Sequence, residues 1–156
     1  MSEILSQLER IETERACERL VYAYSRALDA GDMSAAADFF VENGSMSRPM
    51  APDQVIQGRE AIRASLLTRP KTLLTKHLAT NIVIDAEGHD SARGISYLTM
   101  IATTPQQGDE PPFVSHGPVY FGQFVDRFVR EKGEWKFLER RGSIQMKFSG
   151  SAGAGP

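Results

Sequence analysis

The stretch "TKHLATNIVID" at residues 75–85 contains a histidine, His77, shortly before a run of strand-forming residues. Ile82, Val83 and Ile84 favour a β-strand, and the polar and glycine residues that follow favour a turn that ends it. A histidine inside such a strand is costly to desolvate unless a neighbouring group hydrogen-bonds it. We therefore expect His77 to be either a satisfied core residue or a group placed for proton transfer.

Proton transfer by a neutral imidazole requires a second group that fixes its tautomer and stabilises the imidazolium. A carboxylate is the usual partner. The sequence offers Asp29, at the end of the first expected helix, and in principle Asp32, Asp38 or Asp126. The pattern of residues leaves all four open.

Other side chains that could do chemistry are less well placed. His89 lies in "EGHDS", an expected hairpin turn in which solvent surrounds it. His116 lies beside Gly117 and Pro118, which disturb a strand, so it is a candidate pocket residue. Cys17 is expected in the middle of a helix, where a thiol is inert. We find no zinc-type Cys/His spacing, phosphate loop or GxSxG motif, which leaves acid–base chemistry without a metal or cofactor.

The residues before the strands predict three helices. Apolar residues recur at near-helical spacing from residue 3 to about 30, and Gly31 in "DAGD" is expected to stop that helix. Asp32 can cap a short second helix, "MSAAADFF". Gly58 leads into a third, "REAIRASLLTR", which Pro70 closes. We expect short strands between the second and third helices.

The second half of the chain predicts a sheet. Residues 75–85, 92–104, 113–130 and 134–148 are rich in β-branched and aromatic side chains, with turn-forming segments between them. Helices followed by an antiparallel meander are typical of an α+β fold. We expect the sheet to curl around the helices and leave one concave face.

Length and composition limit the number of domains, the classes of binding partner and the cellular setting. A chain of 156 residues fits one domain, residues 1–148, followed by a flexible tail, 149–156. The formal net charge of −2 gives no footprint for nucleic acid or an anionic membrane. The charged N-terminal stretch has no signal-peptide core, and no run is long enough to span a bilayer. The single cysteine favours a reducing, cytoplasmic setting.

Four stretches occur in an order that resembles a known family: "YAYSRALDAGDMSAAADFF", "GREAIRASL", "TKHLATNIVID" and "GQFVDRFVREKGEWKFLERR". Together they look like the SnoaL-like branch of the nuclear transport factor 2-like superfamily, over about Ile11 to Phe148. The resemblance implies a cone-shaped, strongly curved mixed sheet with N-terminal helices closing a deep apolar pocket. Our order of elements agrees with that fold.

Within this superfamily, the resemblance is greatest to a group of lyases that includes dehydratases and dehydrochlorinases. Their shared aspartate and histidine fall on Asp29 and His77, and an asparagine of the same strand falls on Asn81. Further functional residues of individual relatives fall on Tyr24 and Arg140. A relative's acidic residue in the next strand is replaced here by Met100, with Tyr97 and Thr99 nearby to assist.

The resemblance therefore implies a cofactor-free lyase, a dehydratase by class, in which Asp29 orients His77 and Tyr24 or Arg140 stabilises a developing oxyanion. Two alternatives stay open. One is a ketosteroid-isomerase-like enzyme, with Asp126 or Asp29 as the base. The other is a non-catalytic ligand-binding protein or the structural subunit of a ring-hydroxylating dioxygenase. The substrate is expected to be a small apolar or polycyclic compound, because apolar residues are available to line the cone: Phe39, Phe40, Leu66, Met100, Phe113, Tyr120 and Phe124.

The last two strands also predict self-association. In "VYFGQFVDRFV", Val119, Phe121 and Val125 alternate with Tyr120, Phe124 and Phe128, so both faces are apolar. Only one face can line the cone, and an exposed apolar face usually marks an interface. We expect a symmetric homo-oligomer through the outer face of the sheet. The resemblance favours a trimer, with a dimer as the alternative.

Overall fold

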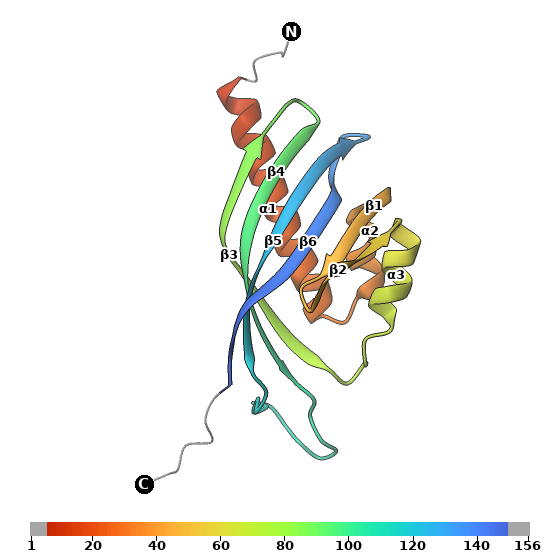
Figure 1. Ribbon diagram of the computed structural model, residues 1–156, viewed down its shortest axis with the longest axis vertical. Helices are drawn as coiled ribbons and strands as arrows, with labels where there is room; N and C mark the ends of the chain where they lie inside the picture. Colours follow the sequence, from red (N-terminus) through yellow and green to blue (C-terminus); the bar gives the residue numbers. More distant parts are fainter. Residues whose placement is uncertain (1–5, 150–156) are drawn as a thin grey trace.

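A computed structural model of the chain describes residues 6–149, in which one curved sheet carries a long helix on one face (Figure 1). The elements in chain order are α1 (Gln7–Asp29), α2 (Met33–Asp38), β1 (Phe40–Arg48), β2 (Ala51–Gln57), α3 (Arg59–Leu67), β3 (Leu74–Ala86), β4 (Ser91–Thr103), β5 (Val119–Glu131) and β6 (Glu134–Phe148). That residues 1–148 form a single domain stays a prediction. The expected tail lies outside the described residues from residue 150 onward.

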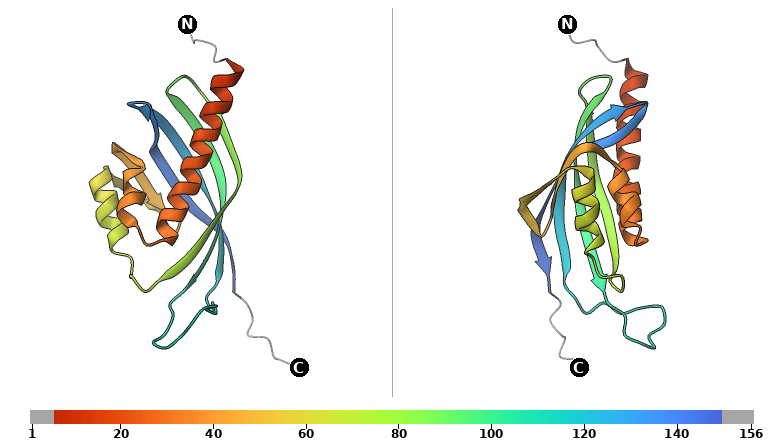
Figure 2. Two further views of the ribbon diagram at one scale, coloured as in Figure 1. Left: turned by 180° about the vertical axis from the view of Figure 1, so that it is seen from behind. Right: turned by 90° about the vertical axis from the view of Figure 1, so that its right-hand side faces the viewer.

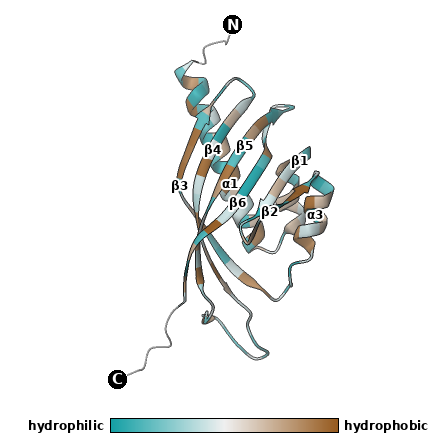
Figure 3. Ribbon diagram, viewed as in Figure 1, coloured by the Kyte–Doolittle hydropathy of each residue, from teal (hydrophilic) through white to brown (hydrophobic). Residues whose placement is uncertain are grey.

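The six strands are ordered β2-β1-β6-β5-β4-β3. Strands β3 to β6 form the expected antiparallel meander, whereas β1 pairs with β6 in parallel. The sheet is therefore mixed, and the prediction of an α+β fold built on a curved mixed sheet is confirmed. Hydrophobic segments recur along β3 and β5 with polar segments between them, as expected for strands with one buried face (Figure 3).

Local sequence signals explain the helix ends. Ser6 and Glu9 form a capping box, so α1 begins at Gln7 rather than at residue 3. The helix stops at Gly31, which has φ of +76°, and Asp32 caps α2 through its side chain, both as predicted. These two stops fix Asp29 at the last turn of α1.

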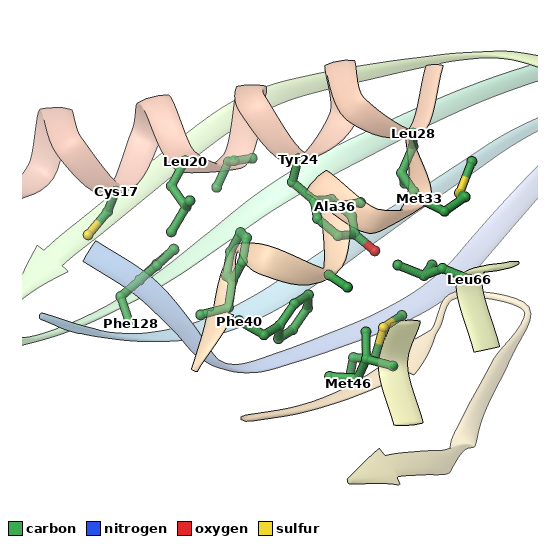
Figure 4. Close-up of a cluster of buried hydrophobic side chains, with 14 of the residues drawn as sticks. Cys17, Leu20, Tyr24, Leu28, Met33, Ala36, Phe40, Met46, Leu66 and Phe128 are labelled. Atoms are coloured by element: carbon green, nitrogen blue, oxygen red, sulfur yellow. The ribbon is translucent and has the colours of Figure 1, made fainter. Parts of the chain in front are cut away.

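Helix α1 lies across one face of the sheet (Figure 2), and its apolar side chains form the core there. Figure 4 shows Cys17, Leu20 and Tyr24 projecting from α1 toward Phe40 and Phe128. Within the described residues, no helix combines the length and apolar character needed to cross a membrane.

Strand β5 starts later than expected. It begins at Val119 instead of residue 113, because residues 104–118 form a long loop. Pro118 lacks the N–H that a ladder requires and Gly117 disfavours a strand, so pairing starts only beyond them.

Candidate active site

The end of α1 and the start of β3 bring a carboxylate and an imidazole together. Oδ1 of Asp29 lies 2.5 Å from Nδ1 of His77. Oδ2 of Asp29 accepts a hydrogen bond of 3.0 Å from the backbone N–H of His77. The two side chains are only 15% and 9% exposed, respectively. Both oxygens of one carboxylate therefore hold one histidine.

Among the four aspartates that the sequence left open, only Asp29 is used in this way. Asp32 caps α2, and Asp38 forms an ion pair with an arginine of α3 at the surface. Asp126 pairs with Arg140 in the core. The geometry thus selects Asp29 as the partner of His77.

The hydrogen bonds around Asp29 keep it ionised. Partial burial by itself raises the pKa of this carboxyl, but bonds from the His77 ring, the His77 backbone and Thr75 outweigh burial and hold the pKa below its ordinary value. An ionised Asp29 requires the proton of the neutral ring to be on Nδ1. Nε2 of His77 then has a free lone pair, as a general base needs.

Thr75 and Arg69 extend this pair. The Thr75 hydroxyl donates to Oδ1 of Asp29 at 2.9 Å and accepts from Nη2 of Arg69 at 2.5 Å. Sequence reasoning missed both residues. Thr75 could have been found, because it lies two positions before His77 and so shares its face of β3. Arg69 lies in the loop after α3, where no periodic pattern places a side chain.

A cavity of about 360 Å³ lies beside this group, between the end of α1, strand β1, the loop after α3, and strands β3 to β5. Its volume is in the range of small-molecule sites, and its lining is mostly apolar. Tyr24, Leu66, Met100 and Phe124 line it, as the sequence predicted. The polar lining residues are Arg48, Thr68, Arg69 and Thr75.

His77 is adjacent to this cavity without being part of its wall. It is the cross-strand partner of Met100, and Thr75 is the partner of Ala102. Cross-strand partners point to the same face of a sheet, so His77 shares the face of three residues that line the cavity.

Two strand residues predicted for the pocket do not line this cavity. Tyr97 is 53% exposed and lines a separate cavity on the opposite face of the sheet. It lies three residues from Met100, and an odd spacing along a strand reverses the face. Asn81 is exposed at a bulge between Thr80 and Val83 and has φ of +49°. The bulge removes it from the face of His77, to which a regular strand would have assigned it.

Five further residues predicted for the pocket do not line this cavity, because of burial or position. Phe40 is fully buried in the core, where its ring packs edge-on against Tyr24 at 5.9 Å. His116 is exposed in the loop between β4 and β5 and, with Phe113, lines a different cavity. Phe39 packs against the core, and Tyr120 is not among the lining residues.

Arg140 lies behind the cavity wall. Its side chain is 1% exposed and bonds to Asp126, also 1% exposed, at 2.6 Å. Its guanidinium carbon stands 4.8 Å from the centre of the Tyr24 ring and 3.7 Å from that of Phe124. Both rings line the cavity, whereas Arg140 does not line it, so Arg140 supports the cavity wall from behind.

Tyr24 is the better placed of the two residues expected to stabilise an oxyanion. It lines the cavity, and burial raises the pKa of its phenol although nearby Arg140 opposes that shift. The hydroxyl therefore stays protonated and can donate. Figure 4 shows its oxygen directed away from α1, toward the Met46 and Leu66 side of the cluster.

The remaining candidates carry no chemistry here. Cys17 is fully buried, and desolvation together with the charge of Asp126 raises the pKa of its thiol to about 12. His89 lies 3.4 Å from Glu9, far along α1 from the cavity. Within residues 6–149, no group of three or more His, Cys, Asp and Glu side chains could hold a metal ion.

Comparison with solved structures supports this description of the fold. A scytalone dehydratase-like protein from Novosphingobium aromaticivorans is 28% identical, with 92% of this chain and 91% of that chain aligned at a TM-score of 0.75. A hexachlorocyclohexane dehydrochlorinase, LinA type 2, aligns over 94% and 95% at a TM-score of 0.76 but is only 15% identical. An aromatic ring hydroxylase-like protein from N. aromaticivorans is 20% identical over 90% and 94%, with a TM-score of 0.71. At these last two identities the likeness shows the fold alone.

Sequence comparison identifies the family. No curated protein matches the chain significantly. The family model for the SnoaL-like domain matches residues 9–141, which contain all but the first two residues of α1, the Asp29–His77 pair and most of the sheet. The chain therefore belongs to the SnoaL-like domain family of the nuclear transport factor 2-like superfamily.

Proposed function

We propose that this protein is a cofactor-free lyase, a dehydratase that removes water from a small apolar substrate, with His77 as its base. The observation that carries the proposal is the pair of contacts from one carboxylate, Asp29, to the ring and the backbone of His77. Such an arrangement fixes the ring tautomer and stabilises the imidazolium, as a general base requires. The dehydratase- and dehydrochlorinase-named proteins of the same fold are consistent with it.

The chemistry follows from the proton positions. Nε2 of His77 takes a proton from a carbon next to a carbonyl group. The electron pair of that C–H bond forms a double bond as the hydroxyl on the neighbouring carbon leaves, and the imidazolium returns its proton to that hydroxyl to give water. Asp29 stabilises the imidazolium, and the Tyr24 hydroxyl donates to the carbonyl oxygen as charge develops there.

The test is a panel of β-hydroxy carbonyl compounds with aromatic or polycyclic skeletons, followed by mass spectrometry. Loss of one water supports the lyase, and His77→Ala should abolish it. Activity of the variant within about threefold of wild type would exclude the dyad, since positioned acid–base groups contribute about 10²–10⁴-fold. A rearranged product of unchanged mass would instead support the isomerase alternative, and inertness toward the whole panel would support the binding-protein alternative.

We further propose that the protein works as a symmetric homo-oligomer, a trimer by family resemblance or else a dimer. Val83, Ile95 and Val125 are neighbours on three adjacent strands and are 56%, 37% and 48% exposed on the face away from α1. A second copy covering this row would remove a contiguous apolar patch from water. Light scattering at micromolar concentration tests this, and a mass near the 17.3 kDa of one chain would refute it. The cytoplasmic setting expected from the single cysteine stays a prediction.

A further inference from the structure

Two arginines line the cavity, and neither hydrogen-bonds to a carboxylate. Arg48 donates to the carbonyl and hydroxyl oxygens of Ser65 and, at 3.4 Å, to the hydroxyl of Thr68. Arg69 donates to the Thr75 hydroxyl at 2.5 Å and to the Leu73 carbonyl at 3.5 Å. No aspartate or glutamate is among the residues that line this cavity. By contrast, the arginines Arg63, Arg93, Arg127, Arg130, Arg140 and Arg141 each pair with a carboxylate.

Arg69 is held next to the catalytic pair without being neutralised by it. Its contact with Asp29 passes through one hydroxyl, because Thr75 accepts from Arg69 and donates to Asp29. Both contacts of Arg69 use Nη2, so the N–H groups on Nε and Nη1 have no acceptor among the described residues. A guanidinium with free donors in fixed positions is suited to binding a planar anion through two parallel hydrogen bonds.

The charges around the cavity favour an anion of single charge. Arg48 and Arg69 contribute +2 and the ionised Asp29 contributes −1, which leaves +1 with His77 neutral. The rest of the wall is apolar, and a poorly hydrated environment strengthens the attraction between a fixed cation and an incoming anion. One carboxylate would balance this charge.

We propose that Arg69 is the anion-binding residue of the cavity and that the substrate is a small apolar compound that bears one carboxylate. This rests on the proposed function, because it names the substrate class of the same site. The carboxylate is a recognition group at the Arg69 end of the cavity. The carbonyl that acidifies the reacting carbon is a separate group, directed toward Tyr24.

The experiment compares two probes of nearly equal shape, 2-naphthoate and 2-naphthylmethanol, by titration calorimetry at pH 7.5 and constant ionic strength. Wild-type protein should bind the carboxylate about 10- to 100-fold more tightly than the alcohol, the ratio that a charge-assisted hydrogen bond supplies. Arg69→Gln should reduce this ratio to about one while leaving the affinity for the alcohol within twofold. Arg69→Lys should keep part of it.

Matched controls isolate the role of Arg69. Arg93→Gln removes an exposed arginine of β4 that pairs with Asp85, and it should keep the full ratio. An unchanged affinity for the alcohol shows that each variant is folded. Equal binding of both probes by wild-type protein, or loss of the ratio in Arg48→Gln but not in Arg69→Gln, would overturn the assignment.

The outcome is separable from that of the proposed function. His77→Gln should keep the preference for 2-naphthoate, because Arg69 and not the imidazole binds the carboxylate. If no lyase activity exists, the preference still supports Arg69 as the anion site. If lyase activity depends on His77 but the protein does not prefer 2-naphthoate over 2-naphthylmethanol, the carboxylate-bearing substrate class is refuted and the lyase function is not.

Discussion

Two aspartates that are largely shielded from solvent each meet a basic side chain at almost the same distance, and the two pairs differ in their surroundings. Asp29 and His77 are 2.5 Å apart at the edge of a cavity, with 15% and 9% of their side chains exposed. Asp126 and Arg140 are 2.6 Å apart inside the core, each 1% exposed. The first pair lies next to the cavity where we propose that it acts on a substrate, whereas the second pair is buried from solvent.

The carboxylates of Asp29 and Asp126 also differ in how many hydrogen bonds they accept. Asp29 accepts three hydrogen bonds, which keep its pKa low despite partial burial. Asp126 has one oxygen with no partner among the described residues, and its burial raises the pKa to about 6 against the opposing charge of Arg140. A buried ion pair with an unpaired oxygen is weak evidence for stability. Its use here is positional, since Arg140 stacks on Tyr24 and Phe124 of the cavity wall.

The comparison predicts a large loss of activity at the exposed pair. His77→Ala should lower kcat of the dehydration by about 10²–10⁴-fold, because the general base is removed. Its stability should change little, since the imidazole lies at the edge of the core. Steady-state kinetics and a thermal melt of the same preparation measure both. If His77→Ala were unfolded, or if it kept a nearly normal kcat, the Asp29–His77 pair would not differ from the buried pair by affecting activity rather than stability.

The buried pair should show the opposite result, a large loss of stability. Asp126→Ala leaves Arg140 charged and unpaired in the core, and such a change costs about 3–5 kcal/mol. The matched control is the double variant Asp126→Leu with Arg140→Met, which replaces both charges by apolar groups and should be close to wild type in free energy of unfolding. Urea unfolding measures it. A cost below about 1 kcal/mol for Asp126→Ala would mean that the pair is not structurally important.

Much of the fold was predictable because short-range signals determine it. The stop at Gly31, the cap at Asp32 and the alternating strands follow from local backbone chemistry. The parallel pairing of β1 with β6 was not, because it joins segments almost a hundred residues apart with no turn between them to fix the register.

The candidate site was predictable only in part. On a helical wheel Asp29 lies off the face formed by Leu20, Tyr24 and Leu28, so periodicity alone does not direct it toward β3. Family resemblance did, and the structure shows why it works: α1 ends at Asp29, where the side chain is free to reach the next layer. The position of Asn81 was not predictable, because a bulge inserts one extra residue and reverses the face of the side chains that follow, and it has only a weak sequence signal.

A smaller change should weaken the catalytic pair without removing it. Thr75→Val deletes the hydroxyl that donates to Asp29 and accepts from Arg69. We expect the pKa of Asp29 to rise and kcat/KM to fall about tenfold, equivalent to one lost hydrogen bond to a charged group. The acid side of the pH profile should move to higher pH. Thr75→Ser keeps the hydroxyl and should restore both, whereas a purely structural role would leave the profile in place.

The smallest expected effect is also the sharpest test of the comparison, because the two aspartates predict opposite dependences of stability on pH. The pKa of Asp29 is lower in the folded state than its ordinary 3.8, so its contribution is complete above pH 3.8 and is lost as the pH falls through the folded-state pKa. The pKa of Asp126 is raised to about 6, so the folded state gains from its protonation, and that gain is lost as the pH rises from 3.8 to about 6.

Urea unfolding between pH 3 and 7 should therefore resolve two slopes. The advantage of wild type over Asp29→Asn should be no more than about 1 kcal/mol, since solvent screens a partly exposed carboxylate, and it should shrink below pH 3.8. The Asp126→Leu, Arg140→Met variant should gain on wild type as the pH rises toward 6. If the stability of wild type relative to each variant changed with pH in the same direction for both variants, the two pairs would not be electrostatically distinct, and the distinction between them would have to rest on access to the cavity alone.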